Sequence, residues 1–412
     1  MSPRYVLVIS LVFFGMSVFC QVRTIDFYIT AGISNSPLLK DLNNQVKAHS
    51  IDSLLIKANR LPKVAFNGTL YYAPIINDYG YSEAVTNGGI FSTLVTVSQE
   101  LFTAKTTEAQ YTQLGIQNLS LANTGKITEN DLKKEITSQY LDVCFLSKEI
   151  TSSLETLKSL ENEDAILRQF TEKGIYRQTE YLSFYLELQS QKLSYHEDMS
   201  QYRKELSQLN LLCGISDTSV VALSIPSLEM DHASNPLLSP YFLRFKLDSL
   251  VIQNEKTILD RNYKPKISWF TDAGLLNNVP GDIYKNFGIS LGLNFSLPVY
   301  DGNQRKLNYQ KLKNTEETRK NYQDYFVHQY DARLQQLRDE LARTKSVIPE
   351  IEHQAATASL LLKEDEELLS KGGLPVTEYI TTIKSYISIR QNLNEYQKRI
   401  LQIINEINYW KQ

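Results

Sequence analysis

The chain has few cysteines, no long apolar run and no excess of one charge, and each absence removes a class of protein. There are 3 cysteines among 412 residues, and Cys144 and Cys213 lie in helical patterns, so we predict packed thiols and no disulfide framework. The sequence contains no run of about 18 apolar residues, so it predicts no transmembrane helix. With 43 basic and 46 acidic residues the formal net charge is −3, which gives no basic footprint for nucleic acid.

The sequence also lacks the motifs of catalytic sites. None of the 5 histidines lies beside a second histidine or a cysteine at metal-ligand spacing. No phosphate-binding loop and no dinucleotide-binding glycine motif opens a predicted helix. A G-x-S-x-G sequence at 288–292 lies inside a predicted strand and not at a strand-to-helix turn. We therefore predict no enzyme, no catalytic residue, no cofactor and no metal site.

The N-terminus has the pattern of a secretory signal. Arg4 precedes an apolar stretch from Tyr5 to Phe14 that is too short to span a membrane as a helix, so we predict a signal peptide over residues 1–20. Cleavage after Cys20 would leave Gln21 as the first mature residue. The alternative is a lipoprotein signal with Cys20 acylated. Phe19 argues against this alternative, because a small residue is expected before an acylated cysteine.

Residues 287–297 predict a strand with one apolar face. Apolar and small or polar residues alternate strictly through FGISLGLNFSL, which is the period of a β-strand. Pro298 cannot donate to a sheet, so it marks the end of the strand. Tilted strands of about 9–11 residues cross bilayers in β-barrels. For this strand alone, the alternative is an antiparallel strand over a soluble core.

The two halves of the chain resemble each other. Residues 173–181, KGIYRQTEY, align with residues 371–379, KGGLPVTEY, at an offset of 198 residues. We therefore predict a two-fold structural repeat, with a first repeat over 21–230 and a second over 231–412. Each repeat is predicted to contain a helix, two strands and a long helical hairpin.

The predicted elements follow from these patterns. The opening helices are 37–60 and 236–262, the strands are 63–72, 91–101, 266–274 and 287–297, and the hairpins are 103–212 and 301–411. Turn-forming residues occupy the loops between paired strands. Aromatic residues predict girdles at two membrane interfaces. We place seven of them on the loop side and two at the other end of the second strand pair: Tyr71, Tyr72, Tyr79, Tyr81, Trp269, Phe270 and Tyr284, then Tyr263 and Tyr300.

The helical segments are too long for an ordinary globular domain. The helix from Thr103 to Lys173 would extend roughly 105 Å, with an interruption possible at Asn123–Gly125. The returning arms carry a repeat of 3.5 residues, which predicts supercoiled helices. Its positions are Tyr181, Tyr185, Leu188, Lys192, Tyr195, Met199, Tyr202, Leu206 and Leu209, and in the second arm Tyr379, Ile383, Tyr386, Arg390, Leu393, Gln397, Ile400, Ile404 and Ile407.

Over nearly all of its mature length the chain resembles the TolC-like outer-membrane efflux proteins. The resemblance is carried by Asn35–Leu39, Leu61–Tyr72, Ser290–Gly302 and the two Lys-Gly hairpin tips. It implies an α+β membrane protein of the Gram-negative outer membrane, with long hairpins forming a periplasmic α-barrel. It further implies a homotrimer whose protomers each give four strands to one 12-stranded β-barrel. Four tilted strands cannot close a barrel alone, and open edges are excluded from lipid, so three copies satisfy this requirement.

The resemblance also assigns roles to residues at the hairpin tips. The expected adaptor-docking positions are Gly174, Ile175, Gly372 and Gly373, although a glycine at a helix turn also has a plain backbone reason. The expected constriction at the periplasmic gate falls on Glu378, on Thr381, which is not acidic, and by the repeat on Glu180. A carboxylate in the first turn of a helix is the simpler interpretation of Glu180.

These observations predict a passive exit duct that conducts substrates from a periplasmic adaptor and an inner-membrane pump to the exterior. The alternative within the family is a duct for type I protein secretion. An alternative of another class is a soluble periplasmic coiled-coil adaptor, which would explain the 3.5-residue repeat and the signal peptide. It does not explain two aromatic-flanked pairs of membrane-length strands.

Overall fold

The structure, a computed structural model, describes residues 23–80, 89–217, 219, 221, 223–230, 239–278 and 280–411. The predicted signal peptide with Cys20, Tyr81 and the predicted helix start at 236 lie outside the described residues. The chain forms two compact units. Unit 1 is drawn from Met1–Ser36, Asp131–Asp231 and Gln335–Trp410, and unit 2 from Pro37–Asn130, His232–Leu334 and the last two residues.

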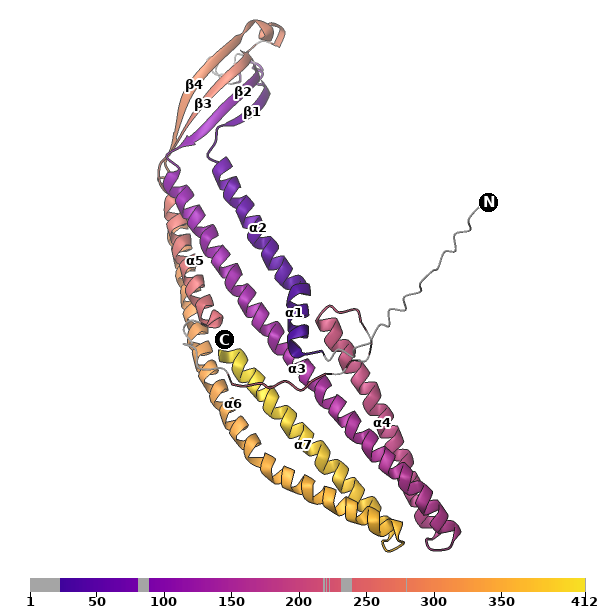
Figure 1. Cartoon of the computed structure of the whole chain (residues 1–412). Helices are drawn as coiled ribbons and strands as arrows, with labels where there is room; N and C mark the ends of the chain where they lie inside the picture. The colour runs from indigo at the N-terminus through magenta and orange to yellow at the C-terminus, as the bar shows by residue number, and fades with distance from the viewer. Residues whose placement is uncertain are drawn as a thin grey trace, which may run out of the picture. The chain divides into compact units, whose positions relative to one another are not determined.

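Unit 2 contains one antiparallel sheet of four strands in the order β1-β2-β3-β4 (Figure 1). The strands are β1 (Lys63–Tyr72), β2 (Gly89–Leu101), β3 (Lys266–Asn277) and β4 (Phe287–Ser296). β1 has the bounds that the sequence predicts. β2 begins two residues earlier, β3 continues three residues further, and β4 ends one residue sooner than predicted. In this chain β1 and β4 are the edge strands.

The register gives the sheet one apolar and one polar face. Residues opposite each other in neighbouring strands point to the same side, and the alternation of β4 therefore fixes the faces of all four strands. Thr96 lies opposite Asp272, which lies opposite Ser290, on the polar face. The apolar face is uncovered in this chain, with Phe66 73% and Leu291 80% exposed. Its larger residues are Val64, Phe66, Leu70, Tyr72, Phe91, Val95, Val97, Leu101, Ile267, Trp269, Leu275, Phe287, Ile289, Leu291, Leu293 and Phe295.

Trp269 and Phe270 correct one prediction. They are the fourth and fifth residues of β3, which begins at its helix end, and they lie opposite Gln99 and Ser98 near the end of β2. Their assignment to the loop side was therefore wrong. The ring of Phe270 lies over Gly292, because a Cβ built there would be 2.3 Å from a ring carbon. This contact explains why β4 has glycine at that point.

The helices of unit 2 pack side by side. They are α2 (Pro37–Ala58), α5 (Pro240–Asn262) and the sheet-proximal parts of α3 (Ala104–Glu172) and α6 (Gln304–Ser370). α3 runs through Asn123–Gly125 without a break, so the interruption considered there does not occur. The buried amide of Asn123 donates to the carbonyl of Pro240 at 2.8 Å and so fixes α3 against α5.

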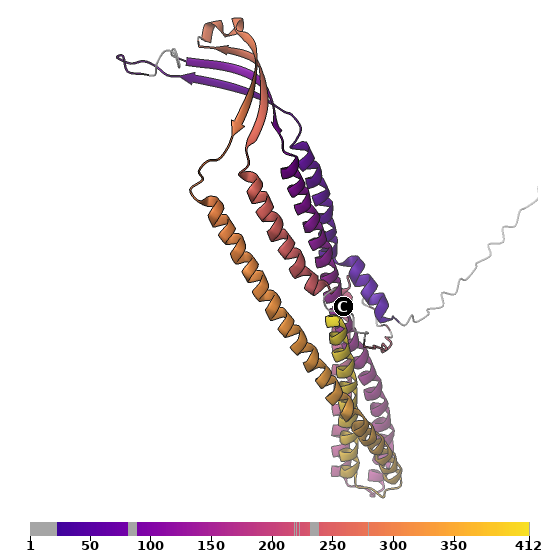
Figure 2. The same cartoon turned by 90° about the vertical axis from the view of Figure 1, so that its left-hand side faces the viewer.

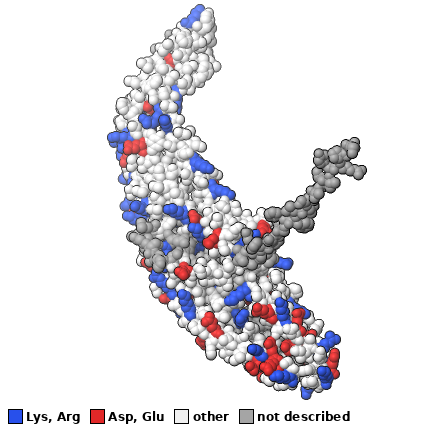
Figure 3. Space-filling view, in the orientation of Figure 1, with Lys and Arg blue, Asp and Glu red and all other residues white. Residues whose placement is uncertain are grey.

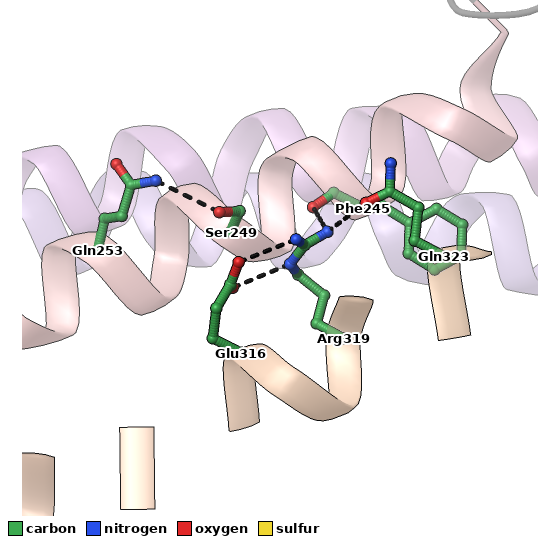
Figure 4. A network of polar contacts seen from close by, with 6 residues as sticks. All are labelled: Phe245, Ser249, Gln253, Glu316, Arg319 and Gln323. Atoms are coloured by element: carbon green, nitrogen blue, oxygen red, sulfur yellow. Dashed lines mark hydrogen bonds and ion pairs between the residues drawn. The ribbon is translucent and has the colours of Figure 1, made fainter. Parts of the chain in front are cut away.

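Arg319 joins α6 to α5. Its guanidinium donates to both carboxylate oxygens of Glu316 at 2.9 Å, to Gln323 at 2.7 Å and to the carbonyl of Phe245 at 3.2 Å (Figure 4). Hydrogen bonding to Arg319 is the largest cause that lowers the pKa of Glu316. A planar guanidinium with several donors is well suited to this bridging role.

Unit 1 contains α1 (Ile25–Asn35), α4 (Gln178–Leu212), α7 (Val376–Lys411) and the remainder of α3 and α6. In the second arm Tyr379, Ile383 and Ile407 are fully buried, as the repeat of 3.5 residues predicts. In the first arm Tyr185 is exposed, and Phe184 beside it is buried. No described helix has both the length and the apolar character needed to cross a membrane.

The cations that the sequence places at matching positions have different partners. Lys192 forms an ion pair with Glu161 of α3 at 3.0 Å. The guanidinium of Arg390 lies 5.8 Å from the centre of the Tyr386 ring on its own helix. Lys192 and Arg390 therefore stand at equivalent positions of the repeat but make different interactions.

We predict that Gly292→Ala destabilises the sheet and that Gly288→Ala does not. The two glycines lie on the same face of β4, but a Cβ at Gly288 meets nothing within 4 Å, whereas one at Gly292 meets the Phe270 ring. Overpacking of this kind costs about 1–3 kcal/mol. Thermal unfolding of the two variants in detergent measures the difference.

The double variant Gly292→Ala/Phe270→Ala supplies the control. Removal of the ring should make the added methyl group harmless, so Gly292→Ala should cost little in the Phe270→Ala background. An equal loss of stability in both backgrounds would show that the Phe270 contact is not the cause.

Candidate functional site at the hairpin tips

Each hairpin turns through a glycine in the left-handed region. Gly174 has φ 75° and Gly372 has φ 72°. The N–H of Gly174 donates to the carbonyl of Thr171 and that of Ile175 to the carbonyl of Phe170. Gly372 and Gly373 make the equivalent bonds at the end of α6. This is the Schellman pattern of a helix end, and it requires a residue without a Cβ penalty.

The two tips lie against each other in both views (Figures 1 and 2). The hydroxyl of Tyr176 donates to the carbonyl of Leu374 at 2.9 Å. A Cβ at Gly372 would be 3.2 Å from the Cγ2 atom of Ile175, so the first tip packs directly on the second glycine. The structure therefore brings the predicted tip residues into one small surface, on which the side chain of Ile175 is 52% exposed.

Glu180 and Glu378 occupy equivalent positions but have different surroundings. The carboxylate of Glu180 accepts a hydrogen bond from the N–H of Arg177 at 2.9 Å, in a capping box. The offset of 198 residues places Pro375 opposite Arg177, and proline has no N–H. Glu378 is exposed in the first turn of α7 without that capping bond. The geometry of Glu180 therefore agrees with the simpler interpretation, a carboxylate in the first turn of a helix.

Thr381 takes no part in an acidic pair. Its side chain is exposed, and its hydroxyl donates to the carbonyl of Thr377 at 2.9 Å within α7. A few residues further along, Lys384 forms an ion pair with Glu187 of α4 at 2.8 Å. This contact joins the returning arms of the two hairpins. Sequence reasoning missed it, because the two residues do not stand at equivalent positions of the repeat.

Buried carboxylates lie behind the tips. Glu163 of α3 is 8% exposed and Asp365 of α6 is 5% exposed. One carboxylate oxygen of each is buried without a hydrogen-bond partner among the described residues. The hydroxyl of Ser159 donates to Glu366 at 2.5 Å. Among the described residues neither Glu163 nor Asp365 forms an ion pair, which is unusual for buried acids.

Burial near these carboxylates raises the pKa of two side chains. Burial, and secondly the charge of Glu366, raises the pKa of Glu163 to about 7. Burial, and secondly the charge of Glu366, also raises the pKa of the Tyr379 hydroxyl on α7. No sequence pattern predicts this group, because its acids come from different helices and follow no spacing motif.

Comparisons with solved structures identify the fold. The Campylobacter jejuni CmeC outer-membrane channel aligns with a TM-score of 0.73 and 12% identity over 94% of this chain and 85% of that one. The Vibrio cholerae outer-membrane protein VceC aligns with a TM-score of 0.73 and 11% identity over 94% and 96%. The protein has an outer-membrane channel fold.

A membrane protein from Pseudomonas aeruginosa shares this fold, with a TM-score of 0.75 and 12% identity over 94% of this chain and 93% of that one. No family model and no curated protein matches the sequence. The expected resemblance is therefore confirmed at the level of the fold. It extends over both units and is not confined to the sheet or to a single hairpin.

We predict that the packing of unit 1 weakens as pH rises through about 7. Because the pKa of Glu163 is raised in the folded state, its stabilising contribution is complete below the ordinary range of a glutamate and is lost as the folded carboxyl ionises. Glu163→Gln keeps a neutral group there. The variant should match the wild type near pH 4 and exceed its stability near pH 8.5 by on the order of 2 kcal/mol.

Melting temperatures measured across this pH range check the prediction. Glu155→Gln, which changes an exposed glutamate of the same helix, is the matched control and should follow the wild-type profile. If the melting temperatures of Glu163→Gln and the wild type changed in parallel with pH, ionisation of Glu163 would not be the cause of the pH dependence.

Proposed function

We propose that the protein is the outer-membrane exit duct of a tripartite efflux system in a Gram-negative bacterium. It would conduct substrates passively from a periplasmic adaptor and an inner-membrane pump to the exterior. The observation that carries the proposal is the amphipathic four-stranded sheet, with its uncovered apolar face and two open edges, in a chain with an outer-membrane channel fold.

The sheet supports assembly into a homotrimer. In lipid, every backbone polar group needs a partner, so the edges of β1 and β4 must be paired. Pairing β4 of one copy with β1 of the next closes a ring, and three copies of four strands give a 12-stranded barrel. The apolar face would then contact lipid and the polar face would line the lumen. On the face that Figure 3 shows, the region of the sheet carries few charged side chains, which supports contact with lipid.

The uncovered apolar face also separates this proposal from a soluble periplasmic adaptor. A face on which Phe66, Leu291 and their neighbours are mostly exposed would be an aggregation hazard in water. The comparisons favour a channel as well, because the aligned proteins match 94% of this chain, strands and helices together. No feature of the described residues favours type I secretion over efflux.

The tips are the proposed periplasmic end of the duct. Gly174, Ile175, Gly372 and Gly373 form one surface, and we propose that the adaptor docks there. Symmetry would place three copies of Glu378 around the neck of the lumen. Its carboxylate lacks the capping bond that holds Glu180, which leaves it available to ions. Because Thr381 is not acidic, we propose a single carboxylate ring that favours cations.

Fractionation of cells followed by cross-linking of the detergent extract tests the proposed assembly. We expect the protein in the outer-membrane fraction, with cross-linked species that end at three copies. A soluble periplasmic monomer would overturn the barrel and favour the adaptor alternative.

Glu378→Gln tests the neck. Removal of the charge should reduce the cation preference measured from reversal potentials in a salt gradient. It should also raise the concentration of a trivalent cation needed for block by roughly tenfold, because multivalent ions respond most strongly to a lost charge.

Glu180→Gln is the matched control, because glutamine can still accept the bond from Arg177 while the charge is lost. We expect it to conduct like the wild type. If both variants alter selectivity equally, or neither does, Glu378 does not form the neck.

A further inference from the structure

A basic cavity lies where the sheet of unit 2 meets its helices. Its volume is about 300 Å³. The end of β2 and the start of α3 form one side, and the end of α5 and the start of β3 form the other. Its charged lining residues are Glu100, Lys105, Arg261, Lys264 and Lys266. Four cations therefore share a small volume with a single carboxylate.

The cations of this cavity have little counter-charge nearby in the described part of the chain, where the carboxylate of Asp260 lies within electrostatic reach of Lys264. None of the four forms an ion pair, and neither does Glu100. Asp260, next to Arg261 in sequence, is already paired with Arg305 at 2.6 Å. Like charges held together repel each other, and a bound anion would relieve that repulsion. The first residues of α3 add backbone N–H groups that have no partner inside the helix.

The cavity also has an apolar wall. Phe102 lines it, with φ 58° and 84% of its side chain exposed. The left-handed region is unfavourable for a bulky residue, so this conformation keeps an aromatic ring in solvent at an energetic cost. Leu101, the last residue of β2, lines the cavity beside it. Cations next to exposed apolar groups match a ligand with a phosphate and a hydrocarbon chain, and aromatic rings are common at membrane interfaces.

We propose that this cavity binds the phosphate of a phospholipid headgroup in the leaflet on the helix side of the sheet. The proposal rests on the proposed function, because a membrane-inserted sheet places this end of its strands at a bilayer surface. Arg261, Lys105 and Lys264 would contact the phosphate oxygens, and the acyl chains would follow the apolar face. Such a contact fixes the depth of the sheet in the membrane, as basic residues and aromatic rings do at interfaces.

A free phosphate-type anion is the other source of the same chemistry. Lys266 lies opposite Ser296 and Glu100 lies opposite Ser268, so both belong to the polar face of the sheet. An anion arriving from that side would meet the same cations. The two sources differ in one respect that can be measured, because only the lipid also gains from the apolar wall.

Thermal shifts of the delipidated full-length protein in a neutral detergent test the proposal. The probes are dioctanoylphosphatidylglycerol, dioctanoylglycerol, which lacks the phosphate, and inorganic phosphate, which lacks the chains. A ligand that binds only the folded state raises the melting temperature. We expect a rise with the phospholipid, none with dioctanoylglycerol, and a smaller rise with phosphate at equal concentration and ionic strength.

Arg261→Gln/Lys264→Gln should raise the phospholipid concentration for half-maximal shift by roughly tenfold, because two charge-assisted contacts are lost. Lys311→Gln/Lys320→Gln changes two exposed cations of α6 and should respond like the wild type. Arg261→Lys/Lys264→Arg keeps the charge at the same two positions and should retain binding. Circular dichroism and the melting temperature without ligand establish that each variant is folded.

The outcomes distinguish a phospholipid from a free anion, and they distinguish this proposal from the proposed function. Inorganic phosphate as effective as the phospholipid, with loss in Arg261→Gln/Lys264→Gln, would support the anion site and assign it to a free anion. Equal responses in that variant and the wild type, an equal rise with dioctanoylglycerol, or no rise at all would overturn the proposal. Binding is measured in detergent, so it is independent of the fractionation experiment. A protein that does not bind phospholipid could still be found in the outer membrane, and a protein found elsewhere could still bind it.

Discussion

The pairing of backbone groups at the sheet edges is the constraint on which the rest of the account depends. One chain supplies four strands with free edges at β1 and β4, and a hydrocarbon environment does not tolerate unpaired N–H and C=O groups. Closure by copies of the same chain satisfies both edges. In the proposed assembly it would also orient the apolar face outward and the polar face inward, and it would carry the attached helices around a common axis.

The sheet was largely predictable because its signal is local. Alternation through 287–297 defines β4, and the register then assigns the faces of the other strands. Position along a strand was harder, and Trp269 was assigned to the wrong end. In the helices, Phe184 is buried where the 3.5-residue repeat favoured Tyr185, because packing partners on other helices decide which neighbour turns inward. Glu163 has no local signal, because its environment is assembled from several helices.

The hairpin tips show how two similar sequences give equivalent glutamates different surroundings. Arg177 and Pro375 stand at equivalent positions, and one N–H decides whether the glutamate three residues later is held as a cap or left exposed. The glycines, by contrast, are used in the same way at both tips, because both helix ends require the left-handed region. Backbone requirements therefore follow from the sequence more directly than side-chain roles.

Disulfide trapping between the two edge strands tests whether β4 of one copy pairs with β1 of the next. Asn67→Cys on β1 would be combined in turn with Gly288→Cys, Ser290→Cys and Asn294→Cys on β4, all on the polar face. In intact outer membranes we expect at least one combination to link separate chains, with products that end at three copies. If no combination links chains while each variant remains folded in the membrane, β1 and β4 do not meet and the shared barrel is wrong.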